Sequence, residues 1–336
     1  MDAKITKQRL SRMLSYDWLK IVGLAAALII VWTLVFTMSA TRITSAQQFT
    51  VINHMNNLSF SNTKFNSTYN DMFEKGNLSY EVLETNYTDL ATSGEYAWQV
   101  LEARLAVGEG DVMFVADTPD KSTAYEEDGV TKYKKSYLET FVGSRWGNVA
   151  RLDGENGYFA KMEAYLNAYY HGDYQNGVID EAKIKADFRA RIKANKDKRY
   201  KKESQIQAGE QLDIERIQKY RDGLVKFNGY LQKGYIEFTE VEVLLSTGVA
   251  EETVDKTGVY AINLCPDVET MGNLKDTAAY LQSYIDEATG EEKYKSSAEN
   301  MNILFFKTDV EEGFEYENVL YVNYLVETYC TELNNK

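Results

Sequence analysis

The chain has 336 residues, a formal net charge of −14, and only two histidines, two cysteines and two prolines. At about 150 residues per domain, this length predicts two domains or one large two-lobed domain. The few cysteines and histidines exclude a disulfide-dense scaffold and a zinc array. The acidic balance argues against a nucleic-acid partner, because such a protein needs basic charge to neutralise phosphates.

An uncharged segment over residues 21–41 follows a short N-terminal stub, residues 1–20. A helix needs about 20 apolar residues to cross a hydrocarbon core, so this segment predicts a transmembrane helix, or signal anchor. The stub has five Lys and Arg against two Asp, a net charge of +3. The positive-inside rule therefore places the stub in the cytoplasm and the bulk of the chain outside the cell membrane. Cleavage of the segment as a signal peptide, near residues 38–40, is the alternative that stays open.

Short apolar runs alternate with amphipathic runs after the span. Strands are expected at residues 48–52, 80–84 and 111–116, with helices at 62–75 and 96–107 between them. This alternation predicts right-handed βαβ units and a mainly parallel sheet that is covered by helices.

Helical periodicity dominates the middle of the chain, and strand patterns return only near residue 235. A sheet region is thus interrupted by a helical region and then resumed. Helices are expected at residues 157–170, 179–200, 203–230 and 315–331, and strands at 235–245, 258–264 and 302–306.

Three stretches carry a resemblance to a known family: residues 101–117 (LEARLAVGEGDVMFVAD), 258–264 (GVYAINL) and 316–329 (YENVLYVNYLVETY). In them the chain resembles the two-lobed extracellular, periplasmic-type solute-binding proteins, in the style of membrane-anchored clostridial relatives. The resemblance implies a two-lobed α/β fold, and the helical periodicity of the middle of the chain predicts that the second lobe is largely helical. Lobe one would comprise residues 42–120 and 257–336, and lobe two residues 121–256.

The same resemblance places a ligand in the cleft between the lobes, at the carboxyl ends of the lobe-one strands. Polar side chains at these ends could hydrogen-bond a small polar ligand. For each of them, capping a helix or forming a turn is the alternative role. The candidates are Asn56, Asn57, Asp89, Asp117 and Thr118.

Two aromatic residues are further candidates for ligand contact. Trp146 lies in an expected loop, Gly-Ser-Arg-Trp-Gly, where its ring could serve as a platform for a flat ligand. Tyr158 begins a stripe of aromatic residues at helical spacing, for which core packing is the alternative.

Lys and Arg gather between residues 183 and 202, where ten of them stand against two Asp. A solvated helix face is the usual meaning of such a run. The sharper hypothesis is an electrostatic contact with an anionic surface, such as lipid headgroups, wall polymers or an acidic partner. The residues predicted for this contact are Lys183, Arg189, Arg191, Lys198 and Arg199.

Motifs for catalysis are missing from the sequence. We find no Gly-x-Ser-x-Gly elbow, no phosphate-cradling Gly-x-x-x-x-Gly-Lys-Ser/Thr loop and no Cys or His pair at zinc spacing. We therefore expect no enzyme activity, no cofactor and no metal site. Cys265 and Cys330 could form a bridge outside the cell or remain two buried free thiols, and the sequence leaves both open.

These patterns together predict a single-span, outward-facing, non-catalytic protein that recognises a small polar ligand and passes it to, or reports it to, a transporter or envelope protein. The alternative is an envelope structural or assembly protein that uses the same fold as an interaction scaffold. An open, aromatic-lined cleft favours the first reading, whereas a cleft that is packed shut favours the second. A third reading, an extracytoplasmic hydrolase, would need two carboxylates that face each other across a cleft.

Overall fold

The chain divides into two compact units, Met1–Arg42 and Ile43–Lys336. The computed structural model describes residues 18–39, 47–54, 70–90, 96–246, 253–266, 281–285, 292–296, 301–308 and 313–330, with the single residues 7, 8, 11, 43, 248 and 290.

Helix α2 (Trp18–Ser39) is the apolar helix expected near the N-terminus. Its part Trp18–Phe36 is long and apolar enough to cross a membrane, and none of that part is buried against the protein. The helical backbone pairs its own N–H and C=O groups, as a hydrocarbon environment requires. A signal sequence has the same properties. In the described part of the chain, α2 is the one helix with these properties.

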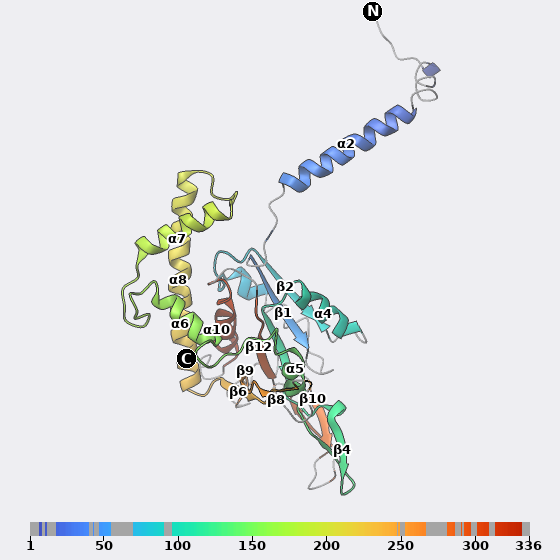
Figure 1. The fold of residues 1–336 in the computed structure, drawn as a ribbon, viewed down its shortest axis with the longest axis vertical. Helices are drawn as coiled ribbons and strands as arrows, with labels where there is room; N and C mark the ends of the chain where they lie inside the picture. The colour runs from blue at the N-terminus through green and yellow to red at the C-terminus, as the bar shows by residue number, and fades with distance from the viewer. Residues whose placement is uncertain are drawn as a thin grey trace, which may run out of the picture. The chain divides into compact units, whose positions relative to one another are not determined.

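Six strands of the second unit form one mixed sheet in the order β2-β1-β3-β12-β9-β6 (Figure 1). Strand β1 runs parallel to β2 and β3, whereas β12 is antiparallel to both β3 and β9, and β9 is antiparallel to β6. The prediction of a mainly parallel sheet is therefore wrong for β12, β9 and β6, which form antiparallel pairs. The strand bounds are β1 Gln48–His54, β2 Glu84–Asp89, β3 Val112–Ala116, β6 Glu237–Val241, β9 Gly258–Asn263 and β12 Met301–Phe305.

Helices cover both faces of this sheet, which explains why β3 (VMFVA) is apolar at every position. Phe114 and Ile303 pack toward α6, α8 and α10, whereas Met113 and Leu304 pack toward α4 and α5 (Figure 1). The helix bounds are α4 Ala97–Ala106, α5 Tyr137–Arg145, α6 Tyr158–Asn167, α8 Glu203–Gln232 and α10 Glu317–Tyr329.

Helix α10 is buried on nearly all sides, because it lies in the core of the helical face and packs against α8. Eleven of its 13 residues are buried, including polar ones. The polar side chains are satisfied inside the protein: Glu317 accepts hydrogen bonds from Ser79 N at 3.0 Å and from the Tyr220 hydroxyl at 2.6 Å.

The two-lobed arrangement is not confirmed. Strand β6, from the segment expected in lobe two, is an edge strand of the sheet that contains β1 and β3. Helix α8, also from that segment, packs against α10 from expected lobe one, and both contribute to one core. Helix α7 (Glu181–Ala194) packs in turn against α8.

Several local predictions are corrected. The strand expected at residues 80–84 is wrong, because Tyr80 and Glu81 lie in a turn and β2 begins only at Glu84. Of the helix expected at residues 62–75, only residues from 70 onward lie in the described part, and residues 70–74 are helical. Helix α5 was not expected at all.

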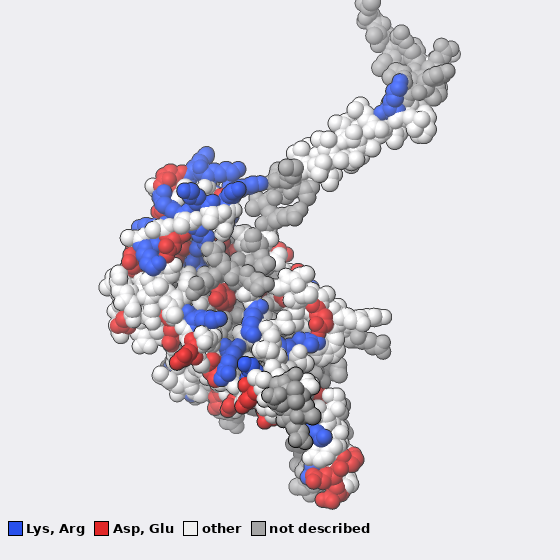
Figure 2. Space-filling model, viewed as in Figure 1, with Lys and Arg blue, Asp and Glu red and all other residues white. Residues whose placement is uncertain are grey.

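Three pairs of short strands were also absent from or only partly present in the expectations. Strands β4 (Ala124–Glu127) and β5 (Val130–Tyr133) form an exposed hairpin whose tip carries acidic side chains (Figure 2). Its turn residues Asp128 and Gly129 have φ of 54° and 75°, as a type I′ turn requires. The remaining pairings are β7 (Leu244–Ser246) with β8 (Thr253–Asp255) and β10 (Leu281–Ile285) with β11 (Glu292–Ser296).

Candidate functional site

The predicted ligand residues at the strand ends lie at one edge of the sheet. Asp89 ends β2 and accepts a hydrogen bond from Asn53 Nδ2 at 3.1 Å, while Asp117 follows β3 directly. Thr118 is buried, and its carbonyl accepts a hydrogen bond from Tyr137 N at 2.7 Å. Asn56 and Asn57 lie outside the described residues.

Trp146 and Tyr158 lie at the opposite edge. Strand β12 runs antiparallel to β3, so Phe305 at its end pairs with Val112 at the beginning of β3. Trp146 and Tyr158 are beside this end of β12, where they line one pocket with Phe306. The two edges are about 15 Å apart, the length of a five-residue strand. The predicted ligand residues therefore do not form a single site.

We call the hollow at this second edge the edge pocket. It has a volume of about 360 Å³, which lies within the range of small-molecule sites. It is formed by the end of α5, the loop that leads to α6, the first turns of α6, and the adjoining ends of β9 and β12. Its lining residues are Trp146, Ala150, Arg151, Asn156, Tyr158, Lys161, Lys256, Tyr260, Phe306, Lys307, Thr308 and Glu315.

Tyr158 forms part of the wall of the edge pocket. Its side chain is 6% exposed, and its hydroxyl donates a hydrogen bond to the carbonyl of Glu315 at 2.7 Å. The ring packs on Phe305 and Tyr316 with centroids 4.9 and 5.7 Å away. Most of the Tyr158 side chain is therefore packed in the core, which was the alternative role for the stripe of aromatic residues.

Trp146 is 38% exposed at the end of α5, so part of its indole is accessible to a ligand. Lys307 Nζ donates hydrogen bonds to the carbonyls of Trp146 and Gly147 at 3.2 and 3.1 Å and lies 5.6 Å from the Trp146 ring centre. Burial and the positive charge of Lys161 lower the pKa of Lys307. The ammonium of Lys307 is thus held beside the ring and near a second cation.

The cations of the edge pocket were not singled out by the sequence. Lys161 belongs to α6, Lys256 precedes β9 and Lys307 follows β12, so nothing in their spacing connects them. Figure 2 shows Lys and Arg side chains gathered over the part of the sheet where β9 and β12 lie in Figure 1. Only the antiparallel pairing of β9 with β12 brings Lys256 and Lys307 to the same edge.

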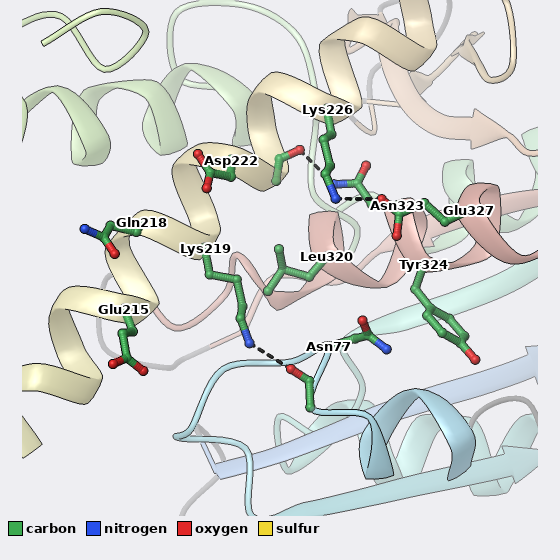
Figure 3. Close-up of a pocket in the computed structure, with 12 residues that line it drawn as sticks. Asn77, Glu215, Gln218, Lys219, Asp222, Lys226, Leu320, Asn323, Tyr324 and Glu327 are labelled. Atoms are coloured by element: carbon green, nitrogen blue, oxygen red, sulfur yellow. Dashed lines mark hydrogen bonds and ion pairs between the residues drawn. The ribbon is translucent and has the colours of Figure 1, made fainter. Parts of the chain in front are cut away.

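A larger hollow of about 500 Å³ lies between α8, α10 and the turn at residues 76–77 (Figure 3). Its lysines are engaged by the chain itself: Lys226 Nζ donates to Glu327 Oε1 and Lys219 Nζ to the carbonyl of Gly76, both at 2.8 Å. Because these ammonium groups already have partners, the edge pocket is the stronger candidate for a ligand.

The five predicted partner-contact residues lie on α7 or just after it, beside the beginning of α8. Figure 2 shows Lys and Arg side chains interspersed with acidic ones over this region. Arg189 pairs with Glu203 and Glu210 of α8, Lys183 pairs with a carboxylate one turn along α7 at 2.9 Å, and Lys198 is exposed.

Two of these arginines reach into the protein. Arg191 Nη2 donates to Asp213 Oδ1 at 3.1 Å, and Arg199 Nη2 donates to Glu81 Oε2 at 3.0 Å. Burial raises the pKa of Asp213, but the charges of Arg216 and Arg191 outweigh burial and keep this pKa below its ordinary value. The geometry thus gives Arg191 and Arg199 a structural role, and their contact with a partner stays a prediction.

Among the described residues, no group of three His, Cys, Asp or Glu side chains is arranged to hold a metal ion. Cys265 and Cys330 are both buried, and neither forms a disulfide bond within the described part of the chain, which agrees with the reading of two buried thiols.

No family model, no curated protein and no solved structure matches this chain. Kinship with the solute-binding proteins therefore stays a prediction that rests on the three stretches quoted above. Function is therefore inferred from the residues of the site itself.

Proposed function

We propose that this chain is a single-span membrane protein that holds residues 43–336 outside the cytoplasm and recognises a small polar ligand there. The uncharged length of α2 and the net charge of +3 on the stub before it support the anchor and its orientation. A transporter or envelope protein that receives or senses the ligand is part of this proposal.

The edge pocket is the observation that carries the proposal. It combines an accessible indole, Trp146, with convergent polar groups in a hollow of about 360 Å³. An aromatic surface with a few oriented polar groups is the usual composition of a small-molecule site. The alternative, an assembly scaffold, draws on the basic run near α7, but several of those side chains already pair with carboxylates of the same chain. We therefore favour ligand recognition without a chemical step.

Thermal unfolding of the full-length protein in detergent micelles tests this function. A library of sugars, amino acids, peptides, organic acids and metal ions is screened, and at least one compound is expected to raise the unfolding temperature. A ligand that binds only the folded state at about 100 times its Kd adds about 2.7 kcal/mol of stability.

The substitution Trp146→Ala is expected to abolish the shift caused by that compound. Trp98→Ala is the matched control, because Trp98 is 39% exposed and lies on α4, outside the edge pocket. Each variant is compared with and without ligand, so any loss of intrinsic stability cancels. A shift that persists in Trp146→Ala, or a library without any stabilising compound, would refute recognition in this pocket.

A further inference from the structure

The edge pocket carries an excess of positive charge. Four cations line it, Arg151, Lys161, Lys256 and Lys307, against the single carboxylate of Glu315, which is a net charge of +3. The whole chain has a formal net charge of −14, so this excess runs against the composition. Convergent charge of one sign in a hollow concentrates ligands of the opposite sign.

Internal pairing neutralises only Arg151 among these cations. Arg151 Nε donates to Asp153 Oδ1 at 2.7 Å, and its Nη2 donates to Asp153 Oδ2 at 3.2 Å. Lys161 and Lys256 form no side-chain hydrogen bond or ion pair within the described residues. Lys307 donates only to two neutral carbonyls, which leaves one of its three N–H donors for a ligand.

The surroundings of these ammonium groups also favour the binding of an anion. The lowered pKa of Lys307 reflects its burial and the unbalanced charge of Lys161 nearby. An anion between them would relieve both effects. Asn156 and Tyr158 bring the N-terminus of α6 to the pocket, and a helix N-terminus adds partial positive charge. The carboxylate of Glu315 is engaged by the backbone N–H of Gly313 at 2.8 Å.

We propose that the edge pocket binds a small organic anion with at least two negative charges, a phosphate monoester or a polycarboxylate, whose apolar part lies against Trp146. Ammonium groups bind such oxygens as point charges, which suits both anions. The volume of about 360 Å³ corresponds to about a dozen waters, and hence to a ligand of about a dozen non-hydrogen atoms. This inference rests on the proposed function, because it names the chemical class of the ligand for the same pocket.

Three aromatic probes of similar size test the inference on the full-length protein in detergent micelles: phenyl phosphate, phthalate and the neutral phthalamide. Binding is followed by tryptophan fluorescence and by the unfolding temperature at low and high salt. At least one anion is expected to bind, with an affinity that falls as salt rises. The anion that binds more tightly distinguishes phosphate from carboxylate chemistry.

A variant that lacks two lysines of the edge pocket is compared with a variant that lacks two lysines elsewhere on the surface. The double variant Lys161→Gln/Lys256→Gln is expected to weaken anion binding about tenfold or more, since each lost lysine removes a charge-assisted hydrogen bond. Both side chains lack internal partners, so the fold should be retained. The control Lys193→Gln/Lys196→Gln, two exposed lysines at the end of α7, should change the affinity less than about twofold.

Two results would overturn the inference. In the first, neither anion changes the fluorescence or the unfolding temperature. If phthalamide or a neutral library compound then binds in a Trp146-dependent manner, the proposed function survives without the anion, and otherwise both fail. In the second, the anions bind the pocket variant and the control variant equally, which would place the binding elsewhere on the molecule.

Discussion

Asp111 lies where the Gly-Glu-Gly turn enters β3, and its Oδ2 accepts a hydrogen bond from the backbone N–H of Thr50 at 2.7 Å. Burial raises the pKa of Asp111 to about 7, and the nearby carboxylate of Glu317 acts in the same direction. The folded protein therefore binds a proton more tightly at this carboxyl than the unfolded chain does, in which the pKa is about 3.9. The stabilisation that this difference in pKa provides is fully present below about pH 4 and is lost as the pH rises through about 7.

The substitution Asp111→Asn is expected to remove this pH dependence. At pH 8 the variant should be more stable than the parent protein by about 1–3 kcal/mol, because a neutral amide replaces a buried charge and can still accept from Thr50 N. At pH 5 the two proteins should differ much less. Urea unfolding of the full-length protein followed by circular dichroism at both pH values measures the effect.

Asp222→Asn is the control for this experiment, because Asp222 has a side chain that is 61% exposed. It should leave the difference in stability between pH 5 and pH 8 unchanged. If Asp111→Asn behaves like Asp222→Asn, the pKa of the Asp111 carboxyl is not raised to about 7 in the folded protein.

Helices α8 and α10 approach each other closely at Gly223. A Cβ atom at this position would lie 2.6 Å from Leu320 Cδ2, and Asn323 Nδ2 donates to the carbonyl of Gly223 at 2.7 Å. Glycine is otherwise unfavourable inside a helix by about 1 kcal/mol relative to alanine. The packing of α10, and with it the helical face of the sheet, therefore depends on the missing side chain at residue 223.

A pair of Gly→Ala substitutions in the same helix separates packing from helix propensity. Gly223→Ala is expected to lower the free energy of unfolding by about 1 kcal/mol, because the end of the Leu320 side chain must move away from the new Cβ. Gly229→Ala should raise it by up to about 1 kcal/mol, since a Cβ there meets no atom within 4 Å. Urea unfolding measures both, and changes of the same sign would contradict the close approach of the two helices.

Local sequence patterns were sufficient to predict most of the helices and strands, but not which of these elements lie beside each other. The 3.6-residue period placed α8 and α10, and the apolar runs placed β3 and β12, to within a few residues. Strand β2 was misplaced because its side chains are all half-buried at a sheet edge, which weakens the apolar signal. The β4–β5 hairpin has a local signal in the Asp128-Gly129 pair, which is typical of a type I′ turn.

At the scale of the whole molecule, the net charge of −14 divides into parts with different roles. The stub carries a net charge of +3, which under the proposed topology keeps it in the cytoplasm. In the basic run at residues 183–202, the side chains that pair with carboxylates of the same chain are Lys183, Lys185, Arg189, Arg191 and Arg199. The edge pocket keeps unmatched ammonium groups. An acidic composition therefore coexists with a local site for an anion.

The proposed topology predicts the behaviour of the intact protein in cells. With a tag on each terminus, the full-length chain should stay in the membrane fraction after alkaline carbonate and be released by detergent, because α2 is inserted in the bilayer. Protease added to intact cells should remove the C-terminal tag and leave the N-terminal tag protected. A shorter chain in the medium without the N-terminal tag would instead indicate a cleaved signal sequence.

The sequence by itself determined the apolar helix near the N-terminus, the net charge of +3 before it, and the helices and core strands whose periodicity is local. Only the tertiary structure decided that one sheet joins both halves of the domain, that β9 and β12 run against β3, and that Trp146, Lys256 and Lys307 share a pocket. The physical reason is that periodicity reports which face of an element is apolar. The direction of a strand and its neighbours depend on contacts between residues far apart in the sequence, 39 positions for Asn302 and Asn263 and 193 positions for Phe305 and Val112.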